Sequence, residues 1–285
     1  MIFETPRFRP AGDAFMLVEL GNEMSLDVNF RAQGLALAVR QAAVAGVLDA
    51  APCFATVLFH YDSDRIGYDD LQREIARLAE TMAAAGPADL PSRLHYIPAL
   101  YLDPWTRACI EDYAAKIAPR GYDAEGIAAT NGLADAADFA RVHAATEYWV
   151  AAIGSWPGLP FMMALDPRCR LSAPKYNPPR TVTPQGTIGL GGSSTCIYSV
   201  ESPGGYQIFA RTPVPIWSAE GRLRGVGDPM VRLRPGDRVR FLPIDRAEYD
   251  WIDEKVEAGA YEGAVVDYQT FSAGKYRTWA KAVAP

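Results

Sequence analysis

Apolar positions along the first part of the chain alternate between strand spacing and helix spacing. Residues 14–20, AFMLVEL, form a nearly continuous apolar run that is typical of a buried strand, and residues 28–43 carry apolar side chains at helical spacing. Two further runs, residues 47–53 and 54–61, meet near Pro52. Their length and their boundaries predict a pair of strands.

A second helix and another strand follow these elements. Apolar residues recur at intervals of four, three and four positions from Leu71 to Met82, and two aspartates, Asp69 and Asp70, precede them. Acidic residues in a first turn favour the helix dipole, so this segment is expected to be helical. Residues 94–101 have a strand pattern. The order strand, helix, strand, strand, helix, strand predicts an α+β fold with a ferredoxin-like βαββαβ layer.

The composition changes in the second half of the chain. An alanine-rich stretch predicts a helical connecting segment over residues 103–150. From Gly154 onward, glycine and proline supply 29 of 132 residues, or 22%, against 17 of 153, or 11%, before it. Such residues mark turns between short strands, so the doubling predicts an all-β sandwich or barrel. The expected domains are therefore residues 1–102, the connecting segment, and residues 151–285.

Composition narrows the class of protein. With 285 residues, 49% of them apolar, the chain can build a sizeable core. A net charge of −6 argues against a nucleic-acid partner, and the apolar runs are too short for a membrane span. The first ten residues do not resemble a signal peptide. Four widely spaced cysteines predict reduced thiols in a cytoplasmic protein: Cys53, Cys109, Cys169 and Cys196.

Two glycine clusters between residues 178 and 213 carry the clearest chemical signal. G-L-G-G-S-S-T and S-P-G-G lie between short strand-like runs, with Arg180 before them and Arg211 after them. Consecutive backbone amides in such loops favour anions, and an arginine fork suits a carboxylate or a phosphate. The alternative is a pair of tight hairpins that carry surface arginines.

Side chains near these clusters add candidate chemistry. His143 is a candidate for proton transfer, because an unperturbed imidazole has a pKa near neutrality; alternatively, it packs near a helix C-terminus. Tyr148 and Tyr198 are candidate hydrogen-bond donors, or they pack in the core with a polar tip. Hydroxyl groups flank the glycines, but they lack the G-x-S-x-G elbow of serine hydrolases.

Common cofactor and metal motifs are absent from the sequence. The glycine cluster runs into S-T-C-I-Y, a strand pattern, whereas a dinucleotide fingerprint would open a helix. There is no P-loop and no paired His or Cys spacing, so no metal site is expected. No complete catalytic set is visible, which predicts an active site shared with a partner chain.

Longer motifs resemble one protein family. The chain reads P-R at 179–180, S-P-G-G at 202–205, R-T-P at 211–213 and L-R-P-G-D-R-V-R-F at 233–241. Upstream, H-A-A-T-E-Y at 143–148 follows the same pattern. These motifs resemble the allophanate hydrolase subunit 1 family, also called the carboxyltransferase subdomain C/D family. Its members include the B-type subunit of 5-oxoprolinase and a Kip-type inhibitor of a sporulation histidine kinase.

The chain departs from the family pattern at several positions. Ser194 stands where the family usually has Gln, Cys196 where it has Gly, and Lys175 where it has Arg. Phe161 replaces a Tyr, and residues 102–121 and those beyond 245 look like additions. These departures indicate a changed pocket.

The resemblance implies a cyclophilin-like β-barrel after the α+β layer, and a subunit of an ATP-dependent amide- or lactam-processing complex. That complex would be 5-oxoprolinase-like, allophanate hydrolase-like or a carboxyltransferase, with biotin only in a carboxylase context. The implied partners are a second cyclophilin-like subunit (of the allophanate hydrolase subunit 2 type, or the C-type subunit of 5-oxoprolinase) and a lactam-utilisation protein. The lone chain, with half of a composite site, is expected to be inactive. The alternative is a regulatory protein that inhibits a histidine kinase.

Site residues are assigned on the same basis. The catalytic candidates are His143, Tyr198 and Arg211. The expected anion-binding and substrate-binding residues are Arg180, Gly191, Gly192, Ser193, Ser194, Thr195, Gly204, Gly205 and Tyr148. All of these are expected to converge in one pocket of the barrel.

Overall fold

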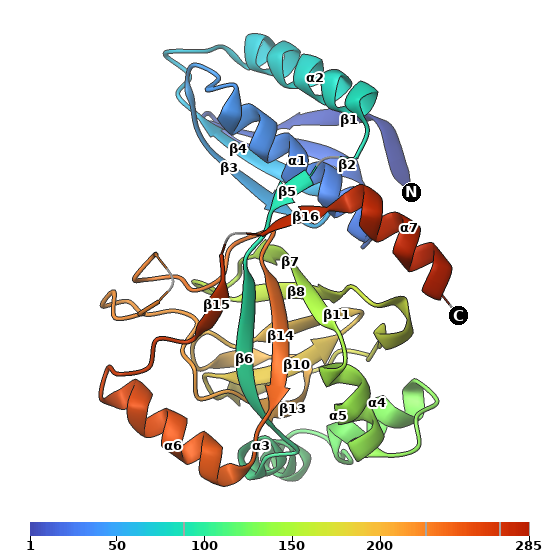
Figure 1. Cartoon of the computed structure of the whole chain (residues 1–285), viewed down its shortest axis with the longest axis vertical. Helices are drawn as coiled ribbons and strands as arrows, with labels where there is room; N and C mark the ends of the chain where they lie inside the picture. The colour runs from blue at the N-terminus through green and yellow to red at the C-terminus, as the bar shows by residue number, and fades with distance from the viewer. Residues whose placement is uncertain (88, 226, 268, 285) are drawn as a thin grey trace. The chain divides into compact units, whose positions relative to one another are not determined.

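The computed structural model describes residues 1–87, 89–225, 227–267 and 269–284, and its chain divides into two compact units (Figure 1). The first unit combines Met1–Ser92 with Thr270–Ala282. The second unit consists mainly of Arg93–Gln269. The C-terminal residues therefore return to the first unit, whereas the sequence analysis placed residues 151–285 in one domain.

The first unit is an antiparallel sheet with two helices. Its strand order is β1 (Ile2–Pro10), β2 (Phe15–Gly21), β4 (Thr56–Tyr61) and β3 (Val47–Cys53). The helices α1 (Leu26–Gln41) and α2 (Tyr68–Ala85) contribute to its core. The core side chains are apolar and fully or almost fully buried, and they include Val18, Val28, Leu35, Val57, Phe59, Leu71 and Ile75.

The ferredoxin-like interpretation was wrong about one strand. Residues 94–101 do form a strand, β6 (Leu94–Tyr101), but it belongs to the sheet of the second unit. The place beside β2 that a ferredoxin-like layer would give to it is taken by β1. The pattern of β1 is weak because most of its side chains are exposed and Pro6 interrupts it.

A short pairing and a helix attach the C-terminus to the first unit. Strand β16 (Thr270–Ser272) pairs with β5 (Asp89–Pro91), and α7 (Ala273–Val283) follows. The rings of Phe271 and Tyr276 pack on Phe30 of α1, with centroids 5.3 and 5.4 Å away. An ion pair of 2.6 Å between Arg277 and Asp27 joins the same two helices.

The second unit is a closed barrel of seven strands. Around the ring they are β13 (Gln207–Arg211), β10 (Thr187–Gly191), β11 (Ser194–Ile197), β8 (Pro160–Ala164), β7 (Glu147–Ile153), β14 (Arg238–Pro243) and β6. Pairing of β6 with β13 closes the ring, and β15 (Ala264–Val266) adds to β6. The pairing of β6 with β14 is parallel, whereas the other pairs are antiparallel. Val150, Ile188, Phe209 and Phe241 belong to its core.

Shorter elements complete the second unit. The helices are α3 (Pro104–Lys116), α4 (Asp123–Thr130), α5 (Ala136–Ala144) and α6 (Arg246–Glu257), with a 3₁₀ turn at Pro167–Cys169 and the strand pair β9 (Arg180–Thr183) and β12 (Ser202–Gly204). The expected helical segment is thus present as α3, α4 and α5. Asp103 caps α3, because its carboxylate accepts the amide hydrogens of Trp105 and Thr106.

A buried carboxylate joins these helices to the barrel. Asp123 of α4 accepts hydrogen bonds from the Tyr176 hydroxyl at 2.7 Å, the Arg120 Nε at 2.8 Å and the backbone amide of Ile208 in β13 at 2.8 Å. Its side chain has no exposed surface. Removing it would leave two buried donors and the half-buried Arg120 without this acceptor.

We therefore predict that Asp123→Ala lowers the free energy of unfolding by about 3–5 kcal/mol, because it breaks a buried ion pair from one side. Denaturant titration measures the change. Asp112→Ala is the control, since Asp112 is 57% exposed in its pair with Lys116 and should change stability by no more than about 0.5 kcal/mol. Equal losses in the two variants would contradict the prediction.

Candidate functional site

The structure distributes the expected site residues over three places. Arg211 and Tyr198 line a cavity beside α6, and Arg180 lies at the far end of the Tyr198 side chain. His143, Tyr148 and Thr195 lie together in the buried interior of the second unit. The single pocket expected from the sequence is therefore divided.

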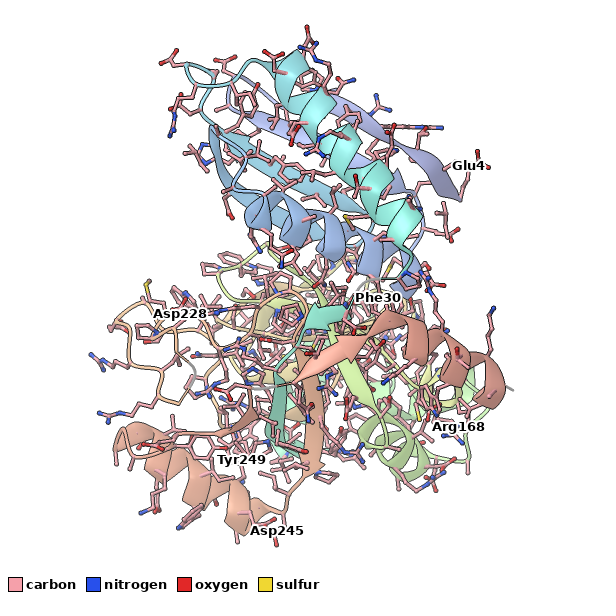
Figure 2. The ribbon with its side chains drawn as sticks, turned by 45° about the horizontal axis from the view of Figure 1, so that its top comes forward. Glu4, Phe30, Arg168, Asp228, Asp245 and Tyr249 are labelled. Atoms are coloured by element: carbon pink, nitrogen blue, oxygen red, sulfur yellow. The ribbon has the colours of Figure 1, made fainter. Side chains whose placement is uncertain are left out.

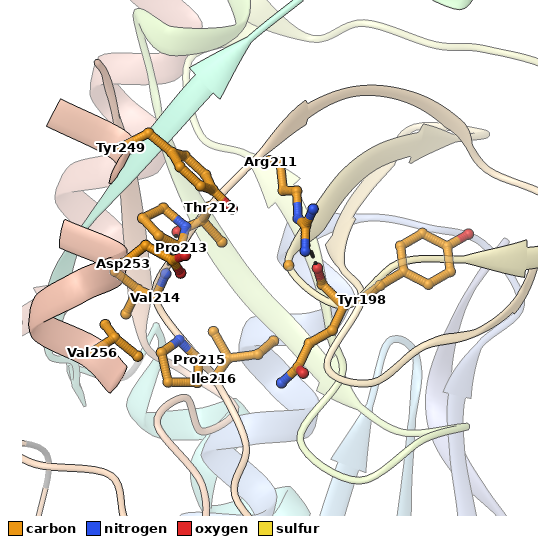
Figure 3. A pocket seen from close by; sticks show the side chains of 12 residues that line it. Tyr198, Arg211, Thr212, Pro213, Val214, Pro215, Ile216, Tyr249, Asp253 and Val256 are labelled. Atoms are coloured by element: carbon orange, nitrogen blue, oxygen red, sulfur yellow. Dashed lines mark hydrogen bonds between the residues drawn. The ribbon is translucent and has the colours of Figure 1, made fainter. Parts of the chain in front are cut away.

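The cavity has a volume of about 180 Å³ and lies between α6 and the segment that follows β13 (Figure 3). Thr212 to Ile216 form one side, and Tyr249, Asp253 and Val256 of α6 form the other. Asp245, shown with Tyr249 in Figure 2, begins α6 through a capping box with Glu248. This cap fixes the start of the helix that forms one side of the cavity.

Arg211, Tyr249 and Asp253 are among the polar residues that line this cavity. The Arg211 Nε donates to the Gln185 carbonyl at 3.2 Å, and its guanidinium lies over the Trp105 ring at 5.1 Å. The Tyr249 ring packs on the same Trp105, and burial raises the pKa of Tyr249 to about 12, so its hydroxyl is protonated at neutral pH. The Asp253 carboxylate completes the set.

This arrangement suits a small polar ligand. A guanidinium and a carboxylate line one cavity, and among the described residues they form no salt bridge with each other. A ligand with an acceptor group and a donor group can bind both of them. The sequence analysis missed Tyr249 and Asp253, because they lie in the residues beyond 245 that looked like an addition.

Tyr198 connects this cavity to Arg180. Its backbone borders the cavity, while its ring points away from α6 (Figure 3). The hydroxyl accepts a hydrogen bond from the Arg180 Nη2 at 3.4 Å. Burial raises the pKa of Tyr198 far above its usual value, so the phenol is neutral and gives Arg180 no negative charge.

Arg180 is a buried cation without a carboxylate. Only 2% of its surface is exposed, its Nε donates to the Thr183 hydroxyl at 3.2 Å, and its Nη1 has no hydrogen-bond partner among the described residues. The guanidinium lies 4.6 Å from the Tyr176 ring, and the guanidinium of Arg120 lies 3.7 Å from that ring. Asp123 is engaged by Arg120, so Arg180 has no salt bridge within the described residues.

Burying an unpaired charge is costly, and proteins normally place a counter-ion beside it. Arg180 is therefore the residue whose environment points most directly to an anionic ligand. The sequence analysis selected it, but expected it in one pocket with Arg211.

Comparison with known proteins decides the family. Residues 6–223 match the family described as carboxyltransferase domain, subdomain C and D. The chain belongs to this family. It is similar to urea amidolyase of Saccharomyces cerevisiae, with 30% identity in an alignment of 278 residues that covers 93% of this chain and 15% of that protein. It is also similar to the B-type subunit of 5-oxoprolinase from Bacillus subtilis, with 28% identity over 238 residues, which are 84% of this chain and 92% of that subunit.

The solved structures agree with the sequence comparison. The chain resembles the crystal structure of the Kluyveromyces lactis urea amidolyase with a TM-score of 0.84 and 28% identity. The match covers 97% of this chain and 17% of that one. This member of the subdomain C and D family therefore spans about a sixth of the urea amidolyases that it matches.

The expected additions are shared with some relatives. The match to the S. cerevisiae urea amidolyase extends over 93% of the chain and that to the B. subtilis protein over 84%, while the family match ends at residue 223. Helix α6, which contributes Tyr249, Asp253 and Val256 to the cavity lining, thus lies beyond the matched family region.

Departures from the family pattern lie around one ring, that of Tyr206. Lys175 places its Nζ 5.2 Å from this ring, and Phe161 packs on it at 6.1 Å. Cys196 belongs to the same cluster, and burial raises the pKa of its thiol to about 12. The Ser194 hydroxyl is buried without a hydrogen-bond partner among the described residues. The changed residues are therefore neighbours, which supports a locally altered site in this family member.

The glycines have a packing role that the sequence analysis did not foresee. A Cβ on Gly191 would collide with the Tyr206 ring, and a Cβ on Gly204 would collide with the Tyr198 hydroxyl. Gly205 approaches the Tyr176 carbonyl instead. The close approach is thus to the chain's own aromatic residues. Gly192, with a φ of +61°, and Ser193 form an exposed turn.

His143 is enclosed by aromatic rings in this family member. Its Nδ1 shares a hydrogen bond with the Tyr101 hydroxyl at 2.8 Å, and its Nε2 with the Thr195 hydroxyl at 3.2 Å. The Tyr148 hydroxyl donates to its backbone carbonyl. Burial lowers the pKa of His143 to about 3, so the ring is neutral at pH 7. These contacts favour the packing alternative.

In the described ranges, no three His, Cys, Asp or Glu side chains gather as metal ligands. Across those same ranges, no helix is long and apolar enough to cross a membrane.

The low pKa of His143 makes stability depend on pH. The unfolded imidazole has a pKa of about 6.5, so between this value and 3 the unfolded state binds more protons and stability falls as the pH falls. When the pH falls from 7 to 5, His143 should therefore lower the free energy of unfolding by about 2 kcal/mol. We predict that the free energy of unfolding of His143→Asn falls less between pH 7 and pH 5 than that of the unaltered chain, and that the difference is about this amount. Denaturant titration of both proteins at the two pH values measures it. Identical losses would show that His143 titrates normally.

Proposed function

We propose that the chain is the subdomain C and D half of a carboxyltransferase-type enzyme that acts on an amide or lactam. A second, homologous cyclophilin-like chain or domain would supply the other half of a composite active site. ATP would be used in the assembled complex, and biotin in a carboxylase context. A lactam-utilisation protein would join a 5-oxoprolinase-type complex, and the protein would work in the cytoplasm.

The buried, uncompensated charge of Arg180 carries this proposal. Carboxyl transfer and amide opening both develop negative charge on oxygen, and a preorganised cation in a water-poor site stabilises such charge strongly. Arg180 is 2% exposed and its Nη1 lacks a partner among the described residues. An anionic group of the substrate, or of the second half-site, would provide the missing counter-charge.

The residues take different roles in this proposal. Arg211, with Tyr249 and Asp253, binds the polar part of a small substrate in the cavity. Tyr198 joins the cavity to Arg180, because its neutral hydroxyl accepts a hydrogen bond from the Arg180 Nη2. His143 and Tyr148 hold the barrel interior in place, and Thr195 bonds to His143. Chemistry that needs a further base would come from the second half-site.

The longer match to a urea amidolyase favours a carboxyltransferase activity over a lactam-opening activity. The match to the urea amidolyase of S. cerevisiae covers 93% of the chain, and the match to the 5-oxoprolinase component of B. subtilis covers 84%. The named relatives are enzymes or enzyme subunits, and none of these names supports the histidine-kinase inhibitor. A 5-oxoprolinase-type activity is the second candidate, because the B. subtilis protein is matched over 92% of its length.

Co-production with the homologous second half tests the proposal. The complex is expected to transfer the carboxyl group of carboxybiotin to a nitrogen of urea, which yields free biotin and N-carboxyurea. Hydrolysis of ATP that depends on 5-oxoproline, without carboxybiotin turnover, would favour the second candidate. The lone chain is expected to show neither activity. Full activity of the lone chain would overturn the composite site.

Arg211→Ala should reduce kcat/KM of the assembled complex by about 10- to 100-fold, because it removes a charge-assisted hydrogen bond worth roughly 1.5–3 kcal/mol. Its effect on stability should stay below about 1 kcal/mol, as expected for a partly exposed side chain. Steady-state kinetics and denaturant titration measure both values. Arg168→Ala is the control, since Arg168 is 59% exposed in its ion pair with Asp166. Unchanged kinetics in Arg211→Ala would assign Arg211 to packing alone.

Arg180→Met and Arg120→Met form a second matched pair. Both guanidiniums lie against Tyr176, but only Arg120 has a carboxylate partner among the described residues. Arg180→Met should leave the lone chain as stable or up to about 3 kcal/mol more stable, while Arg120→Met should cost roughly 3–5 kcal/mol by stranding Asp123. In the complex, Arg180→Met should lower kcat/KM at least tenfold. If Arg180→Met is destabilised but fully active in the complex, Arg180 has a structural role only, and the proposal is wrong.

A further inference from the structure

A second cavity, inside the first unit, has a chemistry distinct from that of the barrel site. It measures about 200 Å³, and nine of its eleven lining residues carry no charge. Leu20 of β2, Phe30 and Leu35 of α1, and Met82 of α2 supply large apolar surfaces. Phe30 is marked in Figure 2. These side chains favour the apolar part of a ligand.

Two arginines supply the charge of this cavity. Arg277 of α7 pairs with Asp27 at 2.6 Å, so its charge is balanced. Arg31 of α1 donates to the Phe3 carbonyl at 3.1 Å, and the salt bridges of the described residues do not include it. A guanidinium has five N–H donors, so Arg31 retains donors for a second acceptor. The lining as a whole therefore has one uncompensated positive charge.

The C-terminal residues create this cavity. Ala273 and Arg277 of α7 line it together with α1, the end of α2 and the turn at Gly86 and Pro87. The rings of Phe271 and Tyr276 hold α7 against Phe30. These residues lie beyond the matched family region, which ends at residue 223.

We propose that this cavity binds a small amphipathic carboxylate, with its hydrocarbon part on Phe30, Leu35 and Met82 and its carboxylate on Arg31. The volume lies below the roughly 300–1,000 Å³ of pockets for drug-sized ligands, so the ligand is a short acyl chain or one aromatic ring. The positive charge of Arg31 favours an anionic ligand over a neutral or cationic one. Bound ligand would tie α7 to α1 and α2. This inference is independent of the proposed enzymatic function.

Calorimetry with butanoate, hexanoate and octanoate on the full chain tests the proposal. Each added methylene should tighten binding by about fourfold, because it is buried against apolar side chains. Hexan-1-ol and hexylamine, with the same carbon chain but no negative charge, should bind at least tenfold more weakly than hexanoate. Absence of carboxylate binding, affinity that is independent of chain length, or equal affinity for hexylamine would overturn the proposal.

Substitutions inside and outside the cavity test whether the carboxylate binds there. Arg31→Gln should weaken octanoate binding at least tenfold, and Ala79→Leu should abolish it by filling the cavity with the helix-compatible side chain of leucine. Arg73→Gln, an exposed arginine of α2 outside the cavity, should bind octanoate like the unaltered chain. Equal losses in Arg31→Gln and Arg73→Gln would contradict the assignment. If Arg31→Gln fails to fold, Ala79→Leu and the ligand series decide the question.

Discussion

Closure of the barrel by β6 is the constraint on which the second unit depends. This strand pairs in parallel with β14 and antiparallel with β13, and its first residues also pair with β15. It brings residues 94–101 into a ring formed by strands that follow residue 147. Closing a sheet on itself removes the open edges that it would otherwise present. The register of β6 places Leu100 opposite Arg211, and this pairing sets the end of β13 at which the cavity begins.

The placement of charge in the second unit follows from this closure. Asp123 accepts a hydrogen bond from the backbone amide of Ile208 in β13 and also pairs with Arg120. This carboxylate therefore balances the charge of one of the two arginines beside Tyr176. Arg180 is left beside Tyr176 and Tyr198, with no carboxylate partner in the part of the chain that the structure describes. Tyrosines that are neutral at pH 7 can accept a hydrogen bond from a guanidinium and stack on it, but they do not balance its charge. The proposed ligand or partner would supply the negative charge that Arg180 lacks among the described residues.

Aromatic packing explains much of what first looked like ligand-binding sequence. Gly191 and Gly204 make room for Tyr206 and Tyr198, and His143 is held among Phe209, Phe241 and two tyrosines. These residues are required for the barrel to close around a filled interior. These motifs therefore reflect the packing of the barrel, while the proposed ligand binding involves Arg180, Arg211 and the α6 side chains. Four departures from the family pattern gather near Tyr206, where they change packing and charge beside Arg180.

The sequence by itself determined several helices and strands, the family, and the choice of Arg180 and Arg211 as candidate anion-binding residues. Helices α1 and α2 and strands β2, β3 and β4 follow from apolar spacing, because spacing reflects which face of each element is buried. Tertiary structure decided which strands share a sheet: β6 has the pattern of a buried strand in either unit, and only its pairing with β13 and β14 places it. Tertiary structure also decided that Arg180 and Arg211 lie at opposite ends of Tyr198, that His143 is enclosed, and that α7 returns to α1. Each of these outcomes depends on contacts between residues far apart in the chain, which local periodicity does not record.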